Sequence, residues 1–410
     1  MTSSLVRDRL TWMTYAQLGA WGYFFYGFGP IVPLLRDEQH TSRSVASLHG
    51  TAFALGGALT GLLLPVLVRR LGRAAVIWLG LAGVGASTVA LLLSHHLPAT
   101  LTSVMLASTS GGLVVNGIVA VLADHHGPGG AAAFSEANAV AAAVGLIAPV
   151  TVGTAVAAGY GWRPGLGVVI VVIVALAVVA MTFRLRAARA APALYGVAAD
   201  PTPYGVAVDQ TPRGVTAGRL PRPYWLVWAS IVATGSVEVC LNLWLADVLR
   251  SHAHVSPGGA TAAVSAVVAG MCVGRLAGGR LTLRLAGTTV MLGALALSAV
   301  GFTVFWLATV PLLALVGLVI TGLGNALHYP LAMSLAVEYS AGQPDLAAAR
   351  TSYALSLSFG IAPFVLGAVA DRIGPHLAFL LVPVFLLMSA LAMTALRRQR
   401  WPRPTGDGPW

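Results

Sequence analysis

The sequence contains little charge and no lysine. Only 9% of its 410 residues are charged, where a soluble domain carries about 25%, and all 24 basic residues are arginine. Hydrophobic residues make up 57%, a composition that excludes a soluble globular protein. The only two cysteines, Cys240 and Cys272, both lie within apolar runs, so a scaffold held by disulfides is also excluded.

Long apolar runs occupy most of the chain instead. A helix needs about 20 apolar residues to cross a bilayer. Twelve segments meet this requirement: residues 11–35, 44–68, 74–93, 101–123, 131–158, 164–183, 223–249, 258–283, 287–308, 311–337, 346–370 and 376–396. The sequence therefore predicts an all-α membrane protein with twelve transmembrane helices.

The arginines predict how these helices are oriented. Most of them fall in the connections on one side: Arg7, Arg9, Arg69, Arg70, Arg73, Arg184, Arg186, Arg189, Arg213, Arg219, Arg222, Arg280, Arg284, Arg350, Arg397, Arg398, Arg400 and Arg403. Because cytoplasmic loops carry an excess of basic residues, we expect both termini in the cytoplasm. The abundance of Ala, Gly, Val and Arg suggests a bacterial inner membrane. The net charge of +11 then comes from the arginines of the cytoplasmic connections, and no nucleic-acid partner is expected.

The chain divides into two related halves. Residues 184–222 are rich in Pro, Gly and Arg and predict a cytoplasmic linker between an N-terminal bundle (1–183) and a C-terminal bundle with its tail (223–410). A constant offset of 214 residues matches the halves: Leu35 with Leu249, Arg36 with Arg250, Gly56 with Gly270, Arg70 with Arg284, Asp124 with Glu338, Pro149 with Pro363, and Gly153 with Gly367. Two six-helix bundles related by a pseudo-twofold axis are typical of carriers that work by alternating access.

The loop after the second span resembles a known family signature. Residues 65–73 read Pro-Val-Leu-Val-Arg-Arg-Leu-Gly-Arg and are similar to the Gly-x-x-x-Asp-Arg-x-Gly-Arg run of the major facilitator superfamily. Pro65 and Arg69 replace the Gly and the Asp of that pattern, which puts the usual Asp-based latch of the family in doubt at this loop. The resemblance covers residues 11–396 and implies a secondary transporter with the fold described above.

Two further similarities concern the branch of the family. Residues 145–153, Gly-Leu-Ile-Ala-Pro-Val-Thr-Val-Gly, resemble the fifth-helix motif of drug exporters, with Ala148 in place of a Gly. The acid in the seventh span and Asn116 in the fourth resemble fucose-type sugar symporters. The resemblance thus allows both export and uptake.

The seventh span carries a carboxylate in its middle. Glu238 has no charged neighbour between Arg222 and Asp247, and it shares a helix face with Thr234 and Asn242. An ionised acid at mid-membrane costs about 3 kcal/mol, so this face must meet protein or water. We predict that Glu238 exchanges the coupling proton; a protonated Glu bonded to a neighbouring helix is the alternative.

Other polar side chains within the spans extend this candidate site. His328 could relay protons, with a structural histidine as the alternative. Arg275 could bind an anionic group, or extend to the cytoplasmic surface. The predicted substrate-binding residues are Tyr23, Tyr26, Asn116, Thr234, Asn242, Arg275, Asn325, Tyr329 and Tyr353.

A cytoplasmic gate is predicted from the repeat. Asp124 and Glu338 occupy matching positions at the cytoplasmic ends of the fourth and tenth spans. We expect them to pair with Arg70, Arg73 and Arg284 when the carrier is closed on that side. Solvated acids that contribute little stability are the alternative.

The remaining motifs argue against enzymatic and metal chemistry. No Gly-rich loop with a lysine is present for binding nucleotide phosphates, and the histidine pairs 95–96 and 125–126 lack further ligands at metal-binding spacing. We expect no enzyme, cofactor or metal. We predict a monomeric, proton-coupled carrier that exports a small, largely apolar organic compound. Uptake of a sugar or similar polar metabolite is the alternative, and a non-transporting receptor or scaffold is disfavoured by the polar faces.

Overall fold

The structure is a computed structural model that describes residues 7–190, 219–282 and 285–399, and the described residues contain helices and no strand. The N-terminal half contains α1 (Arg9–Phe28), η1 (Gly29–Ile31), α2 (Val32–Gln39), α3 (Arg43–Ala46), α4 (Leu48–Leu71), α5 (Arg73–Leu93), α6 (Leu97–His126), η2 (Gly127–Gly129), α7 (Gly130–Ala157) and α8 (Arg163–Ala190). The C-terminal half contains α9 (Arg222–His252), α10 (Pro257–Ala263), α11 (Ser265–Thr282), α12 (Gly287–Leu307), α13 (Pro311–Glu338), α14 (Pro344–Ile373), α15 (Pro375–Ala378) and α16 (Leu381–Arg398).

Twelve of the helical segments in this part of the chain are long and apolar enough to cross a membrane, which confirms the predicted fold class. In lipid every backbone polar group must be bonded within the segment, and a helix meets this demand. Short breaks divide some spans; the first one continues from α1 through η1 into α2. Helix α8 continues to Ala190, past the predicted boundary at residue 183, and most of the predicted linker lies outside the described residues.

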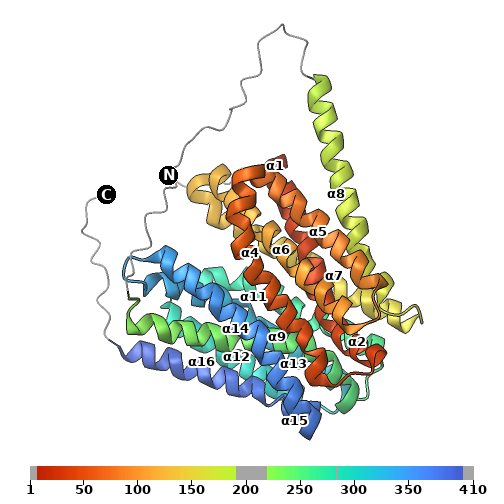
Figure 1. Cartoon of the computed structure of the whole chain (residues 1–410). Coiled ribbons are helices and arrows are strands. Elements are labelled where there is room, and N and C mark those ends of the chain that lie inside the picture. The colour runs from red at the N-terminus through yellow and green to blue at the C-terminus, as the bar shows by residue number, and fades with distance from the viewer. Residues whose placement is uncertain (1–6, 191–218, 283–284, 400–410) are drawn as a thin grey trace.

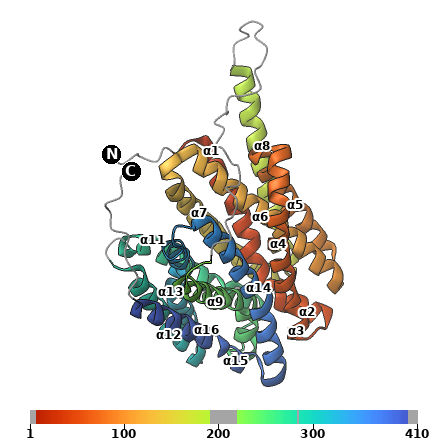
Figure 2. The same cartoon turned by 60° about the vertical axis from the view of Figure 1, so that its left-hand side comes forward.

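The helices form two bundles that meet along one half of their length (Figure 1). The bundles converge towards α2 and α15 and diverge towards the start of α1 and the end of α16. We call the side of Asp8 and the end of α16 the terminal face, and the side of α2 and α15 the opposite face. Helix α14 lies beside α4 in both views, in agreement with the contacts between these helices (Figures 1 and 2).

The contacts between the bundles follow the internal repeat. Helix α4 packs against α14, and α7 packs against α10 and α11. Adding the offset of 214 to α4 (48–71) gives 262–285, which covers α11, and subtracting it from α14 (344–373) gives 130–159, which covers α7. The two contacts are therefore equivalent under the pseudo-twofold relation.

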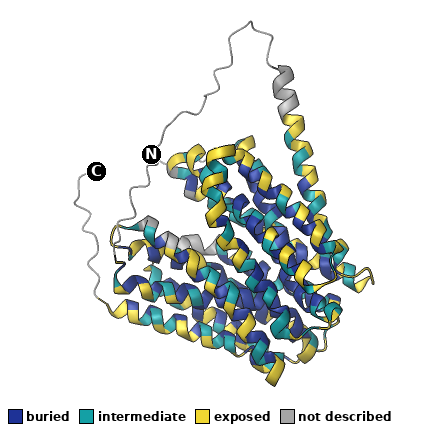
Figure 3. Ribbon diagram, viewed as in Figure 1, coloured by how far each residue is buried: buried dark blue, intermediate teal, exposed yellow. Residues whose placement is uncertain are grey.

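Burial separates the central helices from the peripheral ones. Buried residues lie where helices face one another, and exposed residues cover the outside (Figure 3). In α9 72% of the most apolar window is buried, against 17% in α8. Helix α9 is thus a central helix, and its polar residues meet protein rather than lipid.

Candidate functional site

Small residues bring the bundles into direct backbone contact in the opposite half of the molecule. A Cβ atom on Gly153 of α7 would lie 2.5 Å from the carbonyl oxygen of Gly258 in α10. On the α4–α14 side, the Ser47 and Thr51 hydroxyls donate to carbonyl oxygens of α14 at 2.8 Å each. The bundles are closed against each other here.

Two arginines of the N-terminal bundle bind one buried carboxylate of α9. Arg36 Nη1 lies 2.8 Å from Asp247 Oδ1, and Arg43 Nε lies 2.7 Å from Asp247 Oδ2. The Asp247 side chain is only 3% exposed. Because both of its oxygens are occupied by charged donors, Asp247 is the centre of an ionic latch between the bundles.

A second pair and a helix cap complete this latch. Arg250 of α9 binds Asp37 at 2.6 Å, so arginines at matching positions of the two halves, 36 and 250, each cross to the other bundle. Asp371 of α14 accepts hydrogen bonds from the backbone N–H groups of Arg43 and Ser44 at 2.9 Å, at the first turn of α3. The internal repeat aligns Arg36 with Arg250 in the sequence, but it does not predict that either arginine binds across the bundles.

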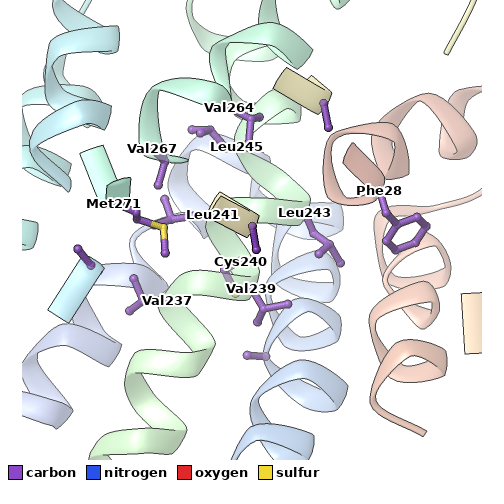
Figure 4. Close-up of a cluster of buried hydrophobic side chains, with 14 of the residues drawn as sticks. Phe28, Val237, Val239, Cys240, Leu241, Leu243, Leu245, Val264, Val267 and Met271 are labelled. Carbon is purple, nitrogen blue, oxygen red and sulfur yellow. The ribbon is translucent and has the colours of Figure 1, made fainter. Parts of the chain in front are cut away.

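A small cavity lies beneath the latch, between α9, α11, α13 and α1. Its volume is about 10 Å³, which is room for about one water molecule. Apolar side chains form most of its wall, among them Leu241 of α9 and Val264, Val267 and Met271 from the α10–α11 segment, all labelled in Figure 4. The polar lining residues are Tyr26, Glu238, Asn242 and Asn325. The structure therefore brings four residues of the predicted site together.

Glu238 lies in the wall of this cavity and is half-buried. The Arg275 guanidinium interacts electrostatically with the Glu238 carboxylate and with the Tyr26 hydroxyl. In the described part of the chain, no ion pair within 4 Å joins Arg275 to Glu238. The two charges therefore attract each other without direct contact. Tyr329 also interacts electrostatically with Glu238, but it is 42% exposed and is not among the residues that line the cavity.

The two asparagines present oxygen atoms that have no partner. Asn242 is 9% exposed and Asn325 is 3% exposed, and the Oδ1 atom of each is buried without a hydrogen bond. Asn242 Nδ2 donates to the carbonyl oxygen of Phe25 in α1 at 3.4 Å, and Asn325 Nδ2 lies 3.7 Å from Met271 Sδ. An unpaired buried acceptor costs about 1–3 kcal/mol, and the Asn242 oxygen lies against Gly29 of η1, where a Cβ atom would approach it to 2.4 Å.

Several predicted site residues lie away from the cavity. The Tyr23 hydroxyl bonds Thr151 and donates to the Gly165 carbonyl at 2.7 Å, which fixes α1 to α7 and α8. Thr234 donates to the Ser230 carbonyl of its own helix at 2.9 Å. These two side chains have packing roles here, because the rotation of each helix directs them into its own bundle.

The other outlying residues are more exposed or belong to another interface. His328 lies between α13 and α12, 3.4 Å from the Ser298 hydroxyl, and does not line the cavity. Asn116 is exposed and donates to Gly112 of its own helix at 2.8 Å. Tyr353 is 63% exposed, with the Arg350 guanidinium 6.0 Å from its ring centre.

The predicted gate residues lie on the terminal face, where the bundles diverge. Arg73 pairs with Asp124 within the N-terminal bundle. Arg70 and Glu338 are exposed and form no ion pair with another described residue, and Arg284 lies outside the described residues. The predicted bridge between the halves thus stays a prediction for a conformation closed on this face.

On the terminal face, the contacts of Arg7 and Asp8 join parts of the N-terminal bundle to one another. Arg7 binds Glu136 at 2.7 Å, and Asp8 caps α1 by accepting a hydrogen bond from Thr11 N at 2.9 Å. Burial of Asp8 opposes ionisation, but the hydrogen bonds from Thr11 and the neighbouring His125 hold the pKa of this carboxyl below its usual range. None of these contacts crosses to the other bundle.

Comparisons with known proteins agree with this architecture. The model of the Major Facilitator Superfamily matches residues 18–246 and 227–409. Uncharacterized MFS-type transporters of Burkholderia mallei (strain SAVP1) and Burkholderia pseudomallei (strain K96243) are 36% identical over 126 residues, and the match spans 30% of this chain and 30% of each relative.

Solved transporter structures share the fold over nearly the whole chain. A bacterial homolog of the human lysosomal transporter Spinster, inward-facing and unoccupied, matches with a TM-score of 0.68 and 15% identity, covering 98% of this chain and 99% of that one. The nucleoside transporter NupG matches with a TM-score of 0.70 and 12% identity, covering 95% and 98%. The twelve spans, the paired bundles and the family match lead to one conclusion: the chain belongs to the major facilitator superfamily and is a multi-pass membrane transporter rather than an enzyme.

Proposed function

We propose that this secondary transporter couples the movement of a small organic compound to protons by alternating access, and that Glu238 exchanges the proton. The observation that carries the proposal is the position of Glu238 in the wall of the cavity between the bundles, within electrostatic reach of Arg275. A carboxylate at this depth changes its charge when its surroundings change, and alternating access changes those surroundings twice in each cycle.

The charges around Glu238 suggest how the coupling works. An ionised Glu238 attracts Arg275 and balances its charge. Protonation of Glu238 removes this attraction and leaves Arg275 free to interact with Tyr26 or with substrate. Binding of proton and binding of substrate then influence each other through Arg275, which is the linkage that coupled transport requires.

The latch at Asp247 and the predicted cytoplasmic gate close the carrier on opposite faces in the two halves of the transport cycle. In the conformation described here the latch at Asp247 joins the bundles on the opposite face, and the terminal face is divergent. We propose that the terminal face is cytoplasmic, as the arginines predict, and that Asp124 and Glu338 approach Arg70, Arg73 and Arg284 after the latch opens. The monomer contains all of these groups, so no partner subunit is required, and the bacterial inner membrane is the proposed location.

Export of the compound is the first candidate direction, because residues 145–153 resemble an exporter motif. Uptake of a polar metabolite is the second, and the presence of Asn242 and Asn325 in the cavity lining favours it. Both directions use the same cavity and the same proton site.

The test is transport by the purified protein in proteoliposomes with an imposed pH gradient. A panel of lipophilic compounds and neutral polyols identifies a transported compound. We expect Glu238→Gln to lower uphill, pH-driven accumulation at least tenfold, while exchange of labelled for unlabelled substrate continues. Glu136→Gln, which changes a carboxylate bound to Arg7 outside the cavity, is the matched control and should retain accumulation. Full pH-driven accumulation by Glu238→Gln would contradict the proposal.

A further inference from the structure

Helices α9 and α14 lie side by side where both begin at the terminal face. The Tyr224 hydroxyl of α9 donates to the Ala347 carbonyl of α14 at 2.8 Å. One turn further along, Trp228 Nε1 donates to the Arg350 carbonyl at 2.9 Å. The two helices therefore run parallel from this face and are joined by side chains of the first two turns of α9.

The outer face of α9 carries a cation and an indole at this end. Arg222 is exposed, and Trp225, one turn below it, is 45% exposed. Residues 222 and 238 differ by 16 positions, which is a rotation of about 160° at 3.6 residues per turn. Arg222 therefore lies on the side of α9 away from Glu238 and the cavity, which is the side that a surrounding bilayer covers.

The outer face of α14 has the same polarity. A set of its exposed residues recurs every three or four positions, as expected for one face of a helix. These residues are Arg350, Tyr353, Leu357, Ile361 and Phe364. The face is cationic near the terminal end and apolar below it, which is the order of a phospholipid headgroup and its acyl chains.

Aromatic side chains connect the two outer faces. The ring centres of Trp225 and Trp228 are 5.8 Å apart, in an edge-to-face arrangement. Trp228 bonds the backbone of Arg350, and the Arg350 guanidinium lies 6.0 Å from the Tyr353 ring centre. Because Trp and Tyr are enriched at the headgroup level of a bilayer, this cluster is at the expected depth for contact with lipid headgroups.

The two guanidinium groups of this cluster are not neutralised by protein. Arg222 and Arg350 form no ion pair within 4 Å with another described residue, whereas Arg7 on the same face binds Glu136. A guanidinium group binds phosphate oxygens with paired N–H donors. A headgroup with net negative charge complements such a surface better than a zwitterionic headgroup, whose own cation offsets its phosphate.

We propose that the seam between α9 and α14 is a binding site for one anionic phospholipid from the leaflet at the terminal face. Its phosphate binds Arg222 and Arg350, its glycerol region contacts Trp225 and Tyr353, and its acyl chains pack on the apolar face of α14. The site lies outside the bundle and apart from the cavity, so it does not depend on the proposed proton coupling.

The experiment measures lipid binding to the full-length protein by native mass spectrometry in detergent. The probes are phosphatidylglycerol and phosphatidylcholine with the same acyl chains. We expect phosphatidylglycerol to bind about tenfold more tightly. Arg222→Gln and Arg350→Gln should each weaken its binding about fivefold, the effect of one arginine near an anionic lipid, and should leave phosphatidylcholine binding unchanged.

Two variants and one soluble probe complete the test. Arg69→Gln removes an exposed arginine at the end of α4 on the same face and should keep the preference for phosphatidylglycerol. Trp225→Leu keeps both guanidinium groups, so it should weaken both lipids alike and retain the preference. Glycerol phosphate, which has the headgroup chemistry without acyl chains, should bind far more weakly than the lipid.

Three results would each overturn the proposal. The first is equal binding of the two lipids by the wild type. The second is a loss in Arg69→Gln as large as that in Arg222→Gln and Arg350→Gln, because the attraction would then belong to the whole basic face. The third is binding of glycerol phosphate as tight as that of phosphatidylglycerol, which would indicate a site for a soluble phosphate compound.

Discussion

Gly29 lies where the first span approaches α9 closely. A Cβ atom at this position would lie 2.4 Å from Asn242 Oδ1 and 2.6 Å from the Asn242 backbone oxygen. The backbone of Gly29 is right-handed helical, with φ −52°, so alanine is sterically allowed by its own conformation. Only the neighbouring bundle forbids a side chain here.

We therefore expect Gly29→Ala to hold the bundles apart on the opposite face. The extra methyl group must displace the backbone of α9 or of η1, which a packed interface resists. Spin labels at the ends of α2 and α9 should report a longer distance between the bundles, and pH-driven transport should fall. Gly57→Ala is the control, because a Cβ at Gly57 has no atom within 4 Å. An unchanged distance distribution in Gly29→Ala would show that the contact does not limit closure.

At the scale of the element, α9 joins the cavity to the latch. Glu238, Asn242 and Asp247 lie on this one helix, over about 13 Å at 1.5 Å per residue. A helix of this length is rigid, so a displacement at the cavity reaches the latch without a separate relay. The mid-membrane site and the opposite face are thereby mechanically connected.

Asp247→Asn should open the latch. The variant leaves Arg36 and Arg43 without their buried carboxylate, and breaking such a pair by removing one partner costs about 3 kcal/mol at the lower end of the usual range. We expect the spin-label distances between α2 and α9 to shift to a population open on the opposite face.

Asp37→Asn provides the graded comparison for this prediction. Asp37 binds Arg36 and Arg250, but its side chain is 40% exposed, so its ion pairs are screened by water and contribute about 0–1 kcal/mol. The shift in the distance distribution should be small. Equal shifts in Asp37→Asn and Asp247→Asn would mean that burial does not set the strength of the latch.

At the scale of the whole molecule, the divergence of the bundles predicts that the region around the cavity is reached from the terminal face. Cys272 is half-buried and interacts electrostatically with Tyr26 across the bundles and with Arg275. Cys240, on α9, is fully buried. Cys272 therefore lies in the part of the structure expected to be open, and Cys240 lies in the closed part.

A membrane-impermeant maleimide should label Cys272 and spare Cys240. With the terminal face in the cytoplasm, inside-out vesicles should react and right-side-out vesicles should not. The Cys272→Ala variant should lose the label, and Cys240→Ala should keep it. Labelling from right-side-out vesicles alone would contradict both the orientation and the open face.

Much of the candidate site was predictable from single residues. An acid in the middle of an apolar run, with Asn242 one turn away, indicated a polar face in α9, and the repeat indicated two bundles around it. Tyr26 and Asn325 were also expected, and both line the cavity. Tyr23, only three residues from Tyr26, lies inside the N-terminal bundle instead, because the rotation of a helix about its axis depends on its neighbours.

The sequence alone determined the twelve spans and the internal repeat, and it predicted the orientation, because the bilayer imposes length, apolarity and arginine placement on each segment separately. Tertiary structure decided which charges meet. Arg36 and Asp247 are 211 positions apart. Asp247 lies near the end of the predicted seventh span and Arg36 lies just beyond the first, so neither position predicts the other. Their pairing, the contact between Asn242 and Gly29 and the face on which the bundles diverge all depend on how two bundles dock, which no local pattern encodes.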